Sequence, residues 1–333
     1  MNPRDIVLAT FQLKSTPIVP YWLPMEDEVA LELDRHWETP NWHEKIIPFV
    51  IACHWGWEPQ IDTSTEGRMR DPFGSIVEIG NILHVTRPAL SSPCLVGYRW
   101  PEITELENWE RMDALYSDKK ESFRLAGLGL GLFERSCQMR GFENFLVDLL
   151  DHPSFVEKLL DGITDIHLRA MEFITQRVQL DAYFGGDDWC GQRGPIMSLR
   201  MWRKFFKPRL AEIIKHCHEL GLPYVCHSCG NVAPLVDDLL DIGLDGLESL
   251  QPEAMDVYEL KRKTSGKLFL MGGLGSQSVL WMGTPAQVRR ETKKLIKYLA
   301  RGGGYILAPS KPLMAGMPIA NAAAFIETAC GQP

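Results

Sequence analysis

From about residue 123 to the end of the chain, short apolar runs alternate with longer stretches of helical periodicity. The short runs predict strands over residues 123–132, 180–184, 224–226, 246–250, 267–271 and 304–307. The longer stretches predict helices over residues 142–150, 155–178, 199–220, 234–240, 254–263, 285–299 and 319–328. Ser198 and Thr284 are suitable N-caps for two of these helices, and Pro285 fits a first helical position. Alternation of this kind is typical of parallel strands joined by helices.

The first 120 residues lack this regular alternation and are rich in Trp and Pro. We predict that they decorate a single domain, residues 1–333, whose fold class is α/β and whose architecture is a (β/α)8 TIM-type barrel. Such a barrel takes about 250 residues or more. An open doubly wound sheet is the alternative, but no Gly-x-Gly-x-x-Gly sequence follows an early strand to indicate its dinucleotide-binding form. We interpret Gly127, Gly129 and Gly131 as positions of close strand packing.

The composition excludes several classes of protein. The chain is 45% hydrophobic with a formal net charge of −8, which is unlike a nucleic-acid-coating protein or a polybasic membrane anchor. No apolar run reaches the roughly 18 residues that a membrane helix needs, and the N-terminus lacks the apolar region of a signal peptide. We therefore expect a cytoplasmic protein without nucleic-acid or membrane partners, and no disulfides among its eight cysteines.

Polar residues and glycines follow the predicted strands at the points where those strands end. They are Asp187 and Asp188, His227 and Cys229, Gln251, Gly272 and Gly273, and Lys311. Because the carboxyl ends of the strands of a barrel lie on one face, we expect these residues to gather there. That face carries the active site in barrel enzymes.

From about residue 183 to residue 327 the chain resembles the uroporphyrinogen decarboxylase superfamily. The resemblance is carried by these stretches: Gly186-Asp187-Asp188, Gln192-Arg193-Gly194, residues 202–208, His227-Ser228-Cys229-Gly230-Asn231, Gln251-Pro252-Glu253, Met271-Gly272-Gly273 with Gln277, residues 302–307, and Pro318 with Asn321. The resemblance implies a (β/α)8 barrel. It also implies one of two chemistries, either decarboxylation of porphyrinogen acetate groups or methyl transfer to or from a corrinoid.

Two features favour the methyltransferase branch. True uroporphyrinogen decarboxylases carry an arginine motif after the first strand, but residues 21–28 contain no arginine and three acids. A porphyrinogen carries many carboxylates, which these acids would repel. The methyltransferases hold zinc with a His-x-Cys pair and a later cysteine, and His227 and Cys229 match that pair. Lys311 stands where we expect the later cysteine.

The candidate roles are as follows. His227 and Cys229 can share one metal ion, with Glu248 as the third ligand and Cys190 or Asp188 as alternatives; without a metal they are a hydrogen-bonded histidine beside an inert cysteine. We expect one of Asp187 and Asp188 to point into the pocket, where it would act as an acid or a base or orient His227. Otherwise the aspartates would cap a helix N-terminus or bond Arg193. Lys311 is a catalytic or anion-binding group, or a surface lysine. Residues expected to bind substrate are Tyr183, Gln192, Gln251, Gly272 and Gly273.

Our leading hypothesis is a methyltransferase that moves a methyl group between a small methylated substrate and a corrinoid protein or a thiol, with zinc as cofactor. The corrinoid (cobalamin) would be carried by a partner protein, and a homodimer is a candidate assembly. The alternative is a decarboxylase, a carboxy-lyase, in which Lys311 binds the substrate carboxylate and an aspartate handles the proton. A binding protein that kept the fold and lost the chemistry is a third hypothesis.

Overall fold

The computed structural model describes residues 2–54, 60–61, 68–78, 84–105 and 109–332. Its strands are β1 (Val50–His54), β2 (Gln60–Ile61), β3 (Arg68–Arg70), β4 (Ile76–Glu78), β5 (His84–Arg87), β6 (Phe123–Gly127), β7 (Ala182–Gly186), β8 (Cys190–Gly191), β9 (Gly194–Pro195), β10 (Tyr224–His227), β11 (Gly246–Leu250), β12 (Phe269–Leu274) and β13 (Tyr305–Pro309). Its helices are α1 (Pro3–Phe11), α2 (Asp27–His36), α3 (Trp109–Asp118), α4 (Leu132–Arg140), α5 (Phe142–Asp151), α6 (Pro153–Thr175), α7 (Leu199–Phe205), α8 (Lys207–Glu219), α9 (Val236–Asp241), α10 (Val257–Thr264), α11 (Pro285–Leu299) and α12 (Ile319–Cys330).

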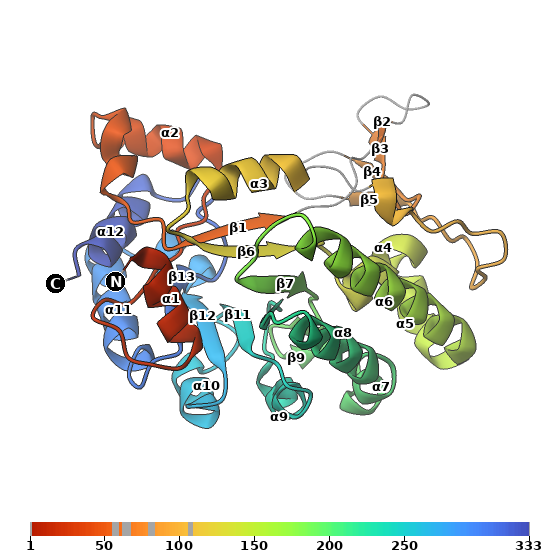
Figure 1. The fold of residues 1–333 in the computed structure, drawn as a ribbon. Coiled ribbons are helices and arrows are strands. Elements are labelled where there is room, and N and C mark those ends of the chain that lie inside the picture. The colour runs from red at the N-terminus through yellow and green to blue at the C-terminus, as the bar shows by residue number, and fades with distance from the viewer. Residues whose placement is uncertain (1, 55–59, 62–67, 79–83, 106–108, 333) are drawn as a thin grey trace.

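Seven parallel strands curl into the central sheet, in the order β1-β6-β7-β10-β11-β12-β13, with helices around them (Figure 1). Beyond β13, Tyr21 continues the sheet by a single parallel bridge to Leu307. Trp22 donates its backbone N–H to the Leu307 carbonyl oxygen at 2.9 Å. The eighth position of the barrel is therefore this one bridge and not a full strand. The predicted α/β TIM-type class is confirmed.

Two glycines in the strands allow close approach of a neighbouring backbone or a large side chain. A Cβ at Gly127 in β6 would lie 1.7 Å from the carbonyl oxygen of Phe184. A Cβ at Gly185 in β7 would lie 1.7 Å from the hydroxyl of Tyr224 in β10. Neither position tolerates a side chain, so Gly127 has the strand-packing role that we expected of it.

Most predicted helices form close to their expected bounds, and α11 has the predicted limits. Ser198 and Thr284 cap α7 and α11 with their side chains. The helix predicted over residues 199–220 is instead two helices, α7 and α8, that meet at Phe206. Pro208 explains the break, because it has no N–H to donate and restricts the residue before it.

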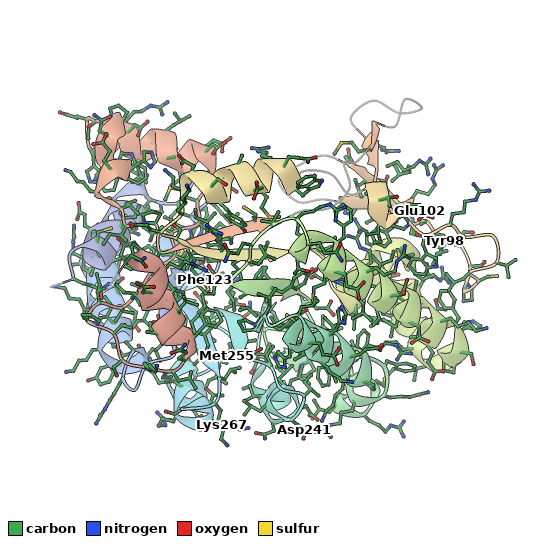
Figure 2. The ribbon with its side chains drawn as sticks, viewed as in Figure 1. Tyr98, Glu102, Phe123, Asp241, Met255 and Lys267 are labelled. Carbon is green, nitrogen blue, oxygen red and sulfur yellow. The ribbon has the colours of Figure 1, made fainter. Side chains whose placement is uncertain are left out.

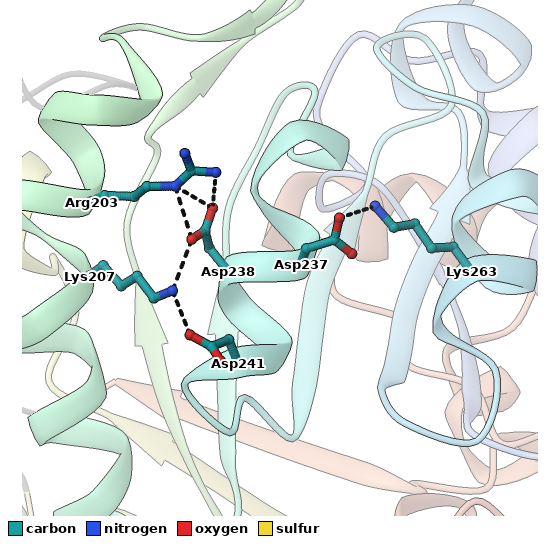
Figure 3. Close-up of polar contacts among 6 residues, drawn as sticks. All are labelled: Arg203, Lys207, Asp237, Asp238, Asp241 and Lys263. Carbon is teal, nitrogen blue, oxygen red and sulfur yellow. Dashed lines mark hydrogen bonds and ion pairs between the residues drawn. The ribbon is translucent and has the colours of Figure 1, made fainter.

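Ion pairs join the helices from α7 to α10 on the outside of the barrel (Figure 3). Asp238 in α9 accepts hydrogen bonds from Arg203 Nε at 3.1 and 3.0 Å and from Lys207 Nζ at 2.9 Å. The hydrogen bonds from Arg203 and the one from Lys207 lower the pKa of Asp238 against the opposing effect of burial. On the other side of α9, Lys263 donates to Asp237 at 2.8 Å.

The N-terminal part does more than decorate the barrel, so our description of it as irregular needs correction. β1 is a full member of the central sheet and pairs with β6 from Val50 to His54. Phe11 of α1 stacks on Phe123 and Phe269, the first residues of β6 and β12, at 4.7 and 4.1 Å between ring centroids. Figure 2 labels Phe123 at this contact. α1 therefore covers the amino ends of the strands.

A small antiparallel sheet, β2-β3-β4-β5, lies apart from the central sheet (Figure 1). Within the described ranges, no helix combines the length and the apolar character that crossing a membrane requires.

Candidate active site

A cavity of about 470 Å³ lies at the carboxyl ends of the central strands. Its polar lining residues are Asp71, Glu134, Arg135, Gln138, Asp188, His227 and Lys311. Phe184 and Leu130 supply apolar surface. Three of the residues singled out by their place after a strand, Asp188, His227 and Lys311, therefore share one cavity.

His227 ends β10 and is oriented by its neighbour in β11. The two strands pair in register with His227 opposite Glu248, whose side chain is buried. The Glu248 carboxylate forms a short hydrogen bond with Nδ1 of His227, which leaves Nε2 for the cavity. Burial opposes a positive charge on the ring, but Glu248 and Cys229 outweigh it and raise the pKa of His227 well above its usual value.

Cys229 and Asp188 lie beside the free nitrogen of His227. The Cys229 Sγ is 3.3 Å from Nε2, and Asp188 Oδ1 is 3.5 Å from the same nitrogen. Cys229 also donates its backbone N–H to Asp188 Oδ1 at 2.7 Å. One ligand atom from each of the three residues lies within 4.8 Å of the other two. This grouping of nitrogen, sulfur and oxygen is a donor set that suits zinc.

The structure changes the expected third ligand. Glu248 was our first choice, but its carboxylate is engaged with the Nδ1 side of His227, away from the nitrogen that faces Cys229. Asp188, one of the two alternatives, completes the group instead. Cys190, the other alternative, is buried and is not part of it. Glu248 therefore has the place of a carboxylate that orients a histidine.

The turn that carries Cys229 is held from both sides. A Cβ at Gly230, whose φ is +81°, would lie 2.5 Å from the Cys190 carbonyl oxygen. Gly230 donates its N–H to Gln251 Oε1 at 3.0 Å, and the Gln251 side chain is buried. Gln251 thus positions the backbone next to Cys229, which corrects our expectation that it binds substrate.

Lys311 lines the cavity, and its ammonium group interacts electrostatically with Cys229. Burial of its ammonium group lowers its pKa, but Cys229, Asp188 and Glu248 outweigh this effect and raise the pKa of Lys311. The lysine therefore places a positive charge against the cysteine sulfur.

Asp187 faces away from the cavity, and our expectation that it is catalytic needs correction. Its two carboxylate oxygens accept the backbone N–H groups of Phe133 and Glu134 at 2.9 Å. They also accept the indole N–H of Trp189 at 2.6 Å. Burial and the Glu134 carboxylate raise the pKa of Asp187, and the donated hydrogen bonds oppose that rise. Asp187 caps the amino end of α4, which is the non-catalytic alternative given above.

The other expected substrate residues lie outside this cavity. A Cβ at Gly272, with φ +119°, would lie 2.6 Å from the Leu250 backbone nitrogen, so this glycine admits strand β11 and not a ligand. A Cβ at Gly273, with φ +98°, would lie 3.3 and 3.4 Å from the Leu295 and Leu299 side chains of α11. Tyr183 is buried in the barrel and stacks on Tyr224. Gln192 is exposed, and its amide donates to Gln277 at 3.3 Å.

Sequence reasoning missed the contribution of α4 to the cavity. Glu134 and Arg135 both line it. Burial and the negative charge of Asp188 raise the pKa of Glu134, whereas His227 and Lys311 lower it. The sequence predicts a strand up to residue 132, but β6 ends at Gly127 and α4 begins at Leu132. Because the predicted strand is too long, the sequence analysis does not recognise Glu134 and Arg135 as a charged pair that follows a strand end.

A family model described as uroporphyrinogen decarboxylase (URO-D) matches residues 110–331. The chain belongs to this family, as the resemblance implied.

Among curated proteins, the chain is similar to the "Methylcobamide:CoM methyltransferase MtaA" of Methanosarcina barkeri, with 27% identity over 196 residues. That match covers 56% of this chain and about half (55%) of the relative. Among solved structures, a methyltransferase from Methanosarcina mazei matches with a TM-score of 0.76 at 18% identity. This match covers 99% of this chain and 98% of the other, and at that identity it shows a shared fold.

Proposed function

We propose that this protein is a methyltransferase that moves a methyl group between a small methylated substrate and a corrinoid protein or a thiol. The observation that carries the proposal is the grouping of Asp188, His227 and Cys229, of which Asp188 and His227 line the cavity at the carboxyl ends of the strands. The similarity to a methylcobamide:CoM methyltransferase supports the same reaction class. Within that class, the methyl donor or acceptor outside the cavity is a corrinoid carried by a partner protein.

Asp188, His227 and Cys229 would hold zinc through an oxygen, a nitrogen and a sulfur atom. When bound there, zinc supplies a positive charge that lowers the pKa of a substrate thiol or polarises a leaving atom. Glu248 holds the His227 ring so that Nε2 faces the cavity, and it fixes the proton on Nδ1. Asp188 holds the backbone of Cys229 in position by accepting its N–H at 2.7 Å.

The decarboxylase alternative gives Lys311 a different task. In that alternative its ammonium group binds a substrate carboxylate, whereas here it interacts electrostatically with Cys229. A positive charge at that point would stabilise a thiolate form of the cysteine. The interaction therefore favours a role for Lys311 beside Cys229 over a role as the substrate anchor.

The test is methyl transfer from free methylcobalamin to 2-mercaptoethanesulfonate by the zinc-reconstituted protein. The decrease in methylcobalamin absorbance monitors the reaction. We expect turnover in the wild type and a loss of about 100-fold or more in His227→Ala, since a metal ion supplies several kcal/mol of charge stabilisation. His36→Ala is the matched control, because His36 is exposed on α2. Unchanged transfer in His227→Ala would show that the proposed mechanism is wrong. Release of carbon dioxide from a panel of acids that is lost in Lys311→Ala would favour the decarboxylase.

A further inference from the structure

Arg135 places a cation in the wall of the cavity. It lies in the first turn of α4, and only 12% of its side chain is exposed. Its guanidinium carbon stacks over the Phe73 ring, 4.0 Å from the ring centroid. Burial lowers the pKa of Arg135 to about 10, so the group is still charged at neutral pH. Buried arginines are normally fully hydrogen-bonded, because an unpaired buried charge is costly.

Only one nitrogen of the guanidinium is engaged. Nη1 lies 3.3 Å from Asp71 Oδ2 and donates to Gln138 Oε1 in a short hydrogen bond. Nε is buried and makes no hydrogen bond in the structure. Nη2 forms none with any other residue whose position is described. The Nε–Nη2 edge of the guanidinium thus lacks an acceptor, and an unmade hydrogen bond of a buried donor costs about 1–3 kcal/mol.

The charges along the cavity fall into two groups. Arg135 interacts electrostatically with Asp71, Tyr98 and Glu134. Glu134 in turn interacts with the second group, Asp188, His227 and Lys311. Arg135, Asp188 and His227 therefore line the same cavity, and Glu134 interacts with both groups of charges. A volume of about 470 Å³ is within the usual range for a site that binds a small molecule.

We propose that Arg135 binds an anionic group of the substrate, a carboxylate or a sulfonate, while the reacting end lies at Asp188, His227 and Cys229. Two oxygens of such a group match the free Nε–Nη2 edge, which is the bidentate arrangement that arginine favours. The assignment of the reacting end rests on the proposed function. The anion subsite itself rests only on Arg135 and its surroundings.

A cationic substrate is the competing possibility, because three carboxylates line the cavity. Two of them are already engaged. Asp71 contacts Arg135 and accepts the Ser75 N–H at 2.7 Å, and Asp188 accepts the Cys229 N–H. Among these charged groups of the cavity, Arg135 is the one with a buried donor atom, Nε, that makes no hydrogen bond. The structure thus favours an anion.

Calorimetric titration of the full chain tests this subsite with small probes. Ethanesulfonate and propionate carry the anion without a thiol, 2-mercaptoethanol carries a thiol without the anion, and 2-mercaptoethanesulfonate carries both. Cysteamine supplies a cation. Each probe is titrated into zinc-loaded and zinc-free protein, for the wild type, Arg135→Gln, Arg135→Lys and the exposed control Arg169→Gln.

We expect ethanesulfonate or propionate to bind the wild type with or without zinc, and to bind Arg135→Gln at least 10-fold more weakly. That factor is the low end for a hydrogen bond to a charged group. 2-Mercaptoethanol should bind both proteins equally, and Arg169→Gln should behave as the wild type. If Arg135→Gln does not fold, Arg135→Lys decides the matter, since it keeps the charge but not the two-nitrogen edge and should weaken only the anionic probes. Which of the two anions binds more tightly identifies the anion class.

Equal affinity of the anions for wild type and Arg135 variants would overturn the proposal, as would tighter binding of cysteamine than of either anion. The outcome also separates this proposal from the proposed function. Zinc-dependent binding of 2-mercaptoethanol without binding of either anion leaves the function standing and removes the subsite. Anion binding without any effect of zinc on the thiol probes leaves the subsite standing and counts against the function.

Discussion

Asp187 and Asp188 are neighbours with opposite roles, and this contrast gives a sharp test. Asp187 accepts hydrogen bonds from two backbone N–H groups of α4 and from the Trp189 indole, all in a buried environment. Asp188 instead faces the cavity beside His227. The same substitution at the two positions should therefore damage different properties of the protein.

In Asp187→Asn, the amide oxygen can keep the backbone donors of α4, but the amide N–H₂ then faces the Trp189 indole N–H, which is also a donor. The indole loses a 2.6 Å hydrogen bond to the carboxyl group and stays buried. A buried donor left without an acceptor costs about 1–3 kcal/mol, and poorer contacts between the amide and the N–H groups of α4 add to the loss. We expect a decrease of about 2–4 kcal/mol in the free energy of unfolding.

Urea denaturation of the metal-free proteins, followed by tryptophan fluorescence, measures this decrease. Asp188→Asn should change the unfolding free energy by less than about 1 kcal/mol, because its carboxylate is partly exposed and accepts a single backbone N–H. Zinc affinity should show the reverse order, with a large loss in Asp188→Asn and little change in folded Asp187→Asn. A stable Asp187→Asn that has lost zinc would refute the assignment of the two roles.

Three further predictions concern individual side chains at and near the barrel core. Glu248→Gln should weaken zinc binding about 10-fold in a chelator competition, because the amide orients His227 without a charge. The exposed control Glu259→Gln should leave the zinc affinity unchanged. Equal zinc affinities of Glu248→Gln and the wild type would contradict the orienting role of Glu248. Lys311→Ala should bind zinc about 10-fold more tightly, since no ammonium then competes for the Cys229 sulfur; weaker binding would contradict this. Burial lowers the pKa of His167 to about 4 in the fold, so the unfolded chain takes up the proton first as the pH falls below about 6.5. Stability should therefore drop by about 3 kcal/mol between pH 6.5 and 4, and His167→Gln should flatten that slope in urea titrations.

The second half of the fold could be predicted from the sequence because its signals are local. Strand β11 and helix α11 have the predicted bounds, since a buried parallel strand is a continuous apolar run and a Thr-Pro pair marks a helix start. The N-terminal part offers weaker signals. β2, β3 and β4 are two or three residues long, which is too short for any periodicity to appear. β1 has only five residues and joins the sheet through long-range pairing with β6.

The candidate site could be predicted only in part. A position after a strand places a residue at the correct face of the barrel, and this rule found Asp188, His227 and Lys311. It does not reveal which of two adjacent aspartates turns inward. It also does not reveal that strand register sets Glu248 directly beside His227, where it orients the ring and leaves the third metal position to Asp188. These choices depend on pairing between strands, which a single sequence does not contain.

The central claim is that Asp188, His227 and Cys229 form one metal site, and elemental analysis tests it most directly. The protein is purified without chelator, reconstituted with zinc and freed of excess metal. The account predicts about one zinc per chain in the wild type and in the exposed-cysteine control Cys94→Ala, and loss of that zinc in Cys229→Ala and Asp188→Ala. A wild type that retains no zinc, or a Cys229→Ala variant that retains it fully, would contradict the account.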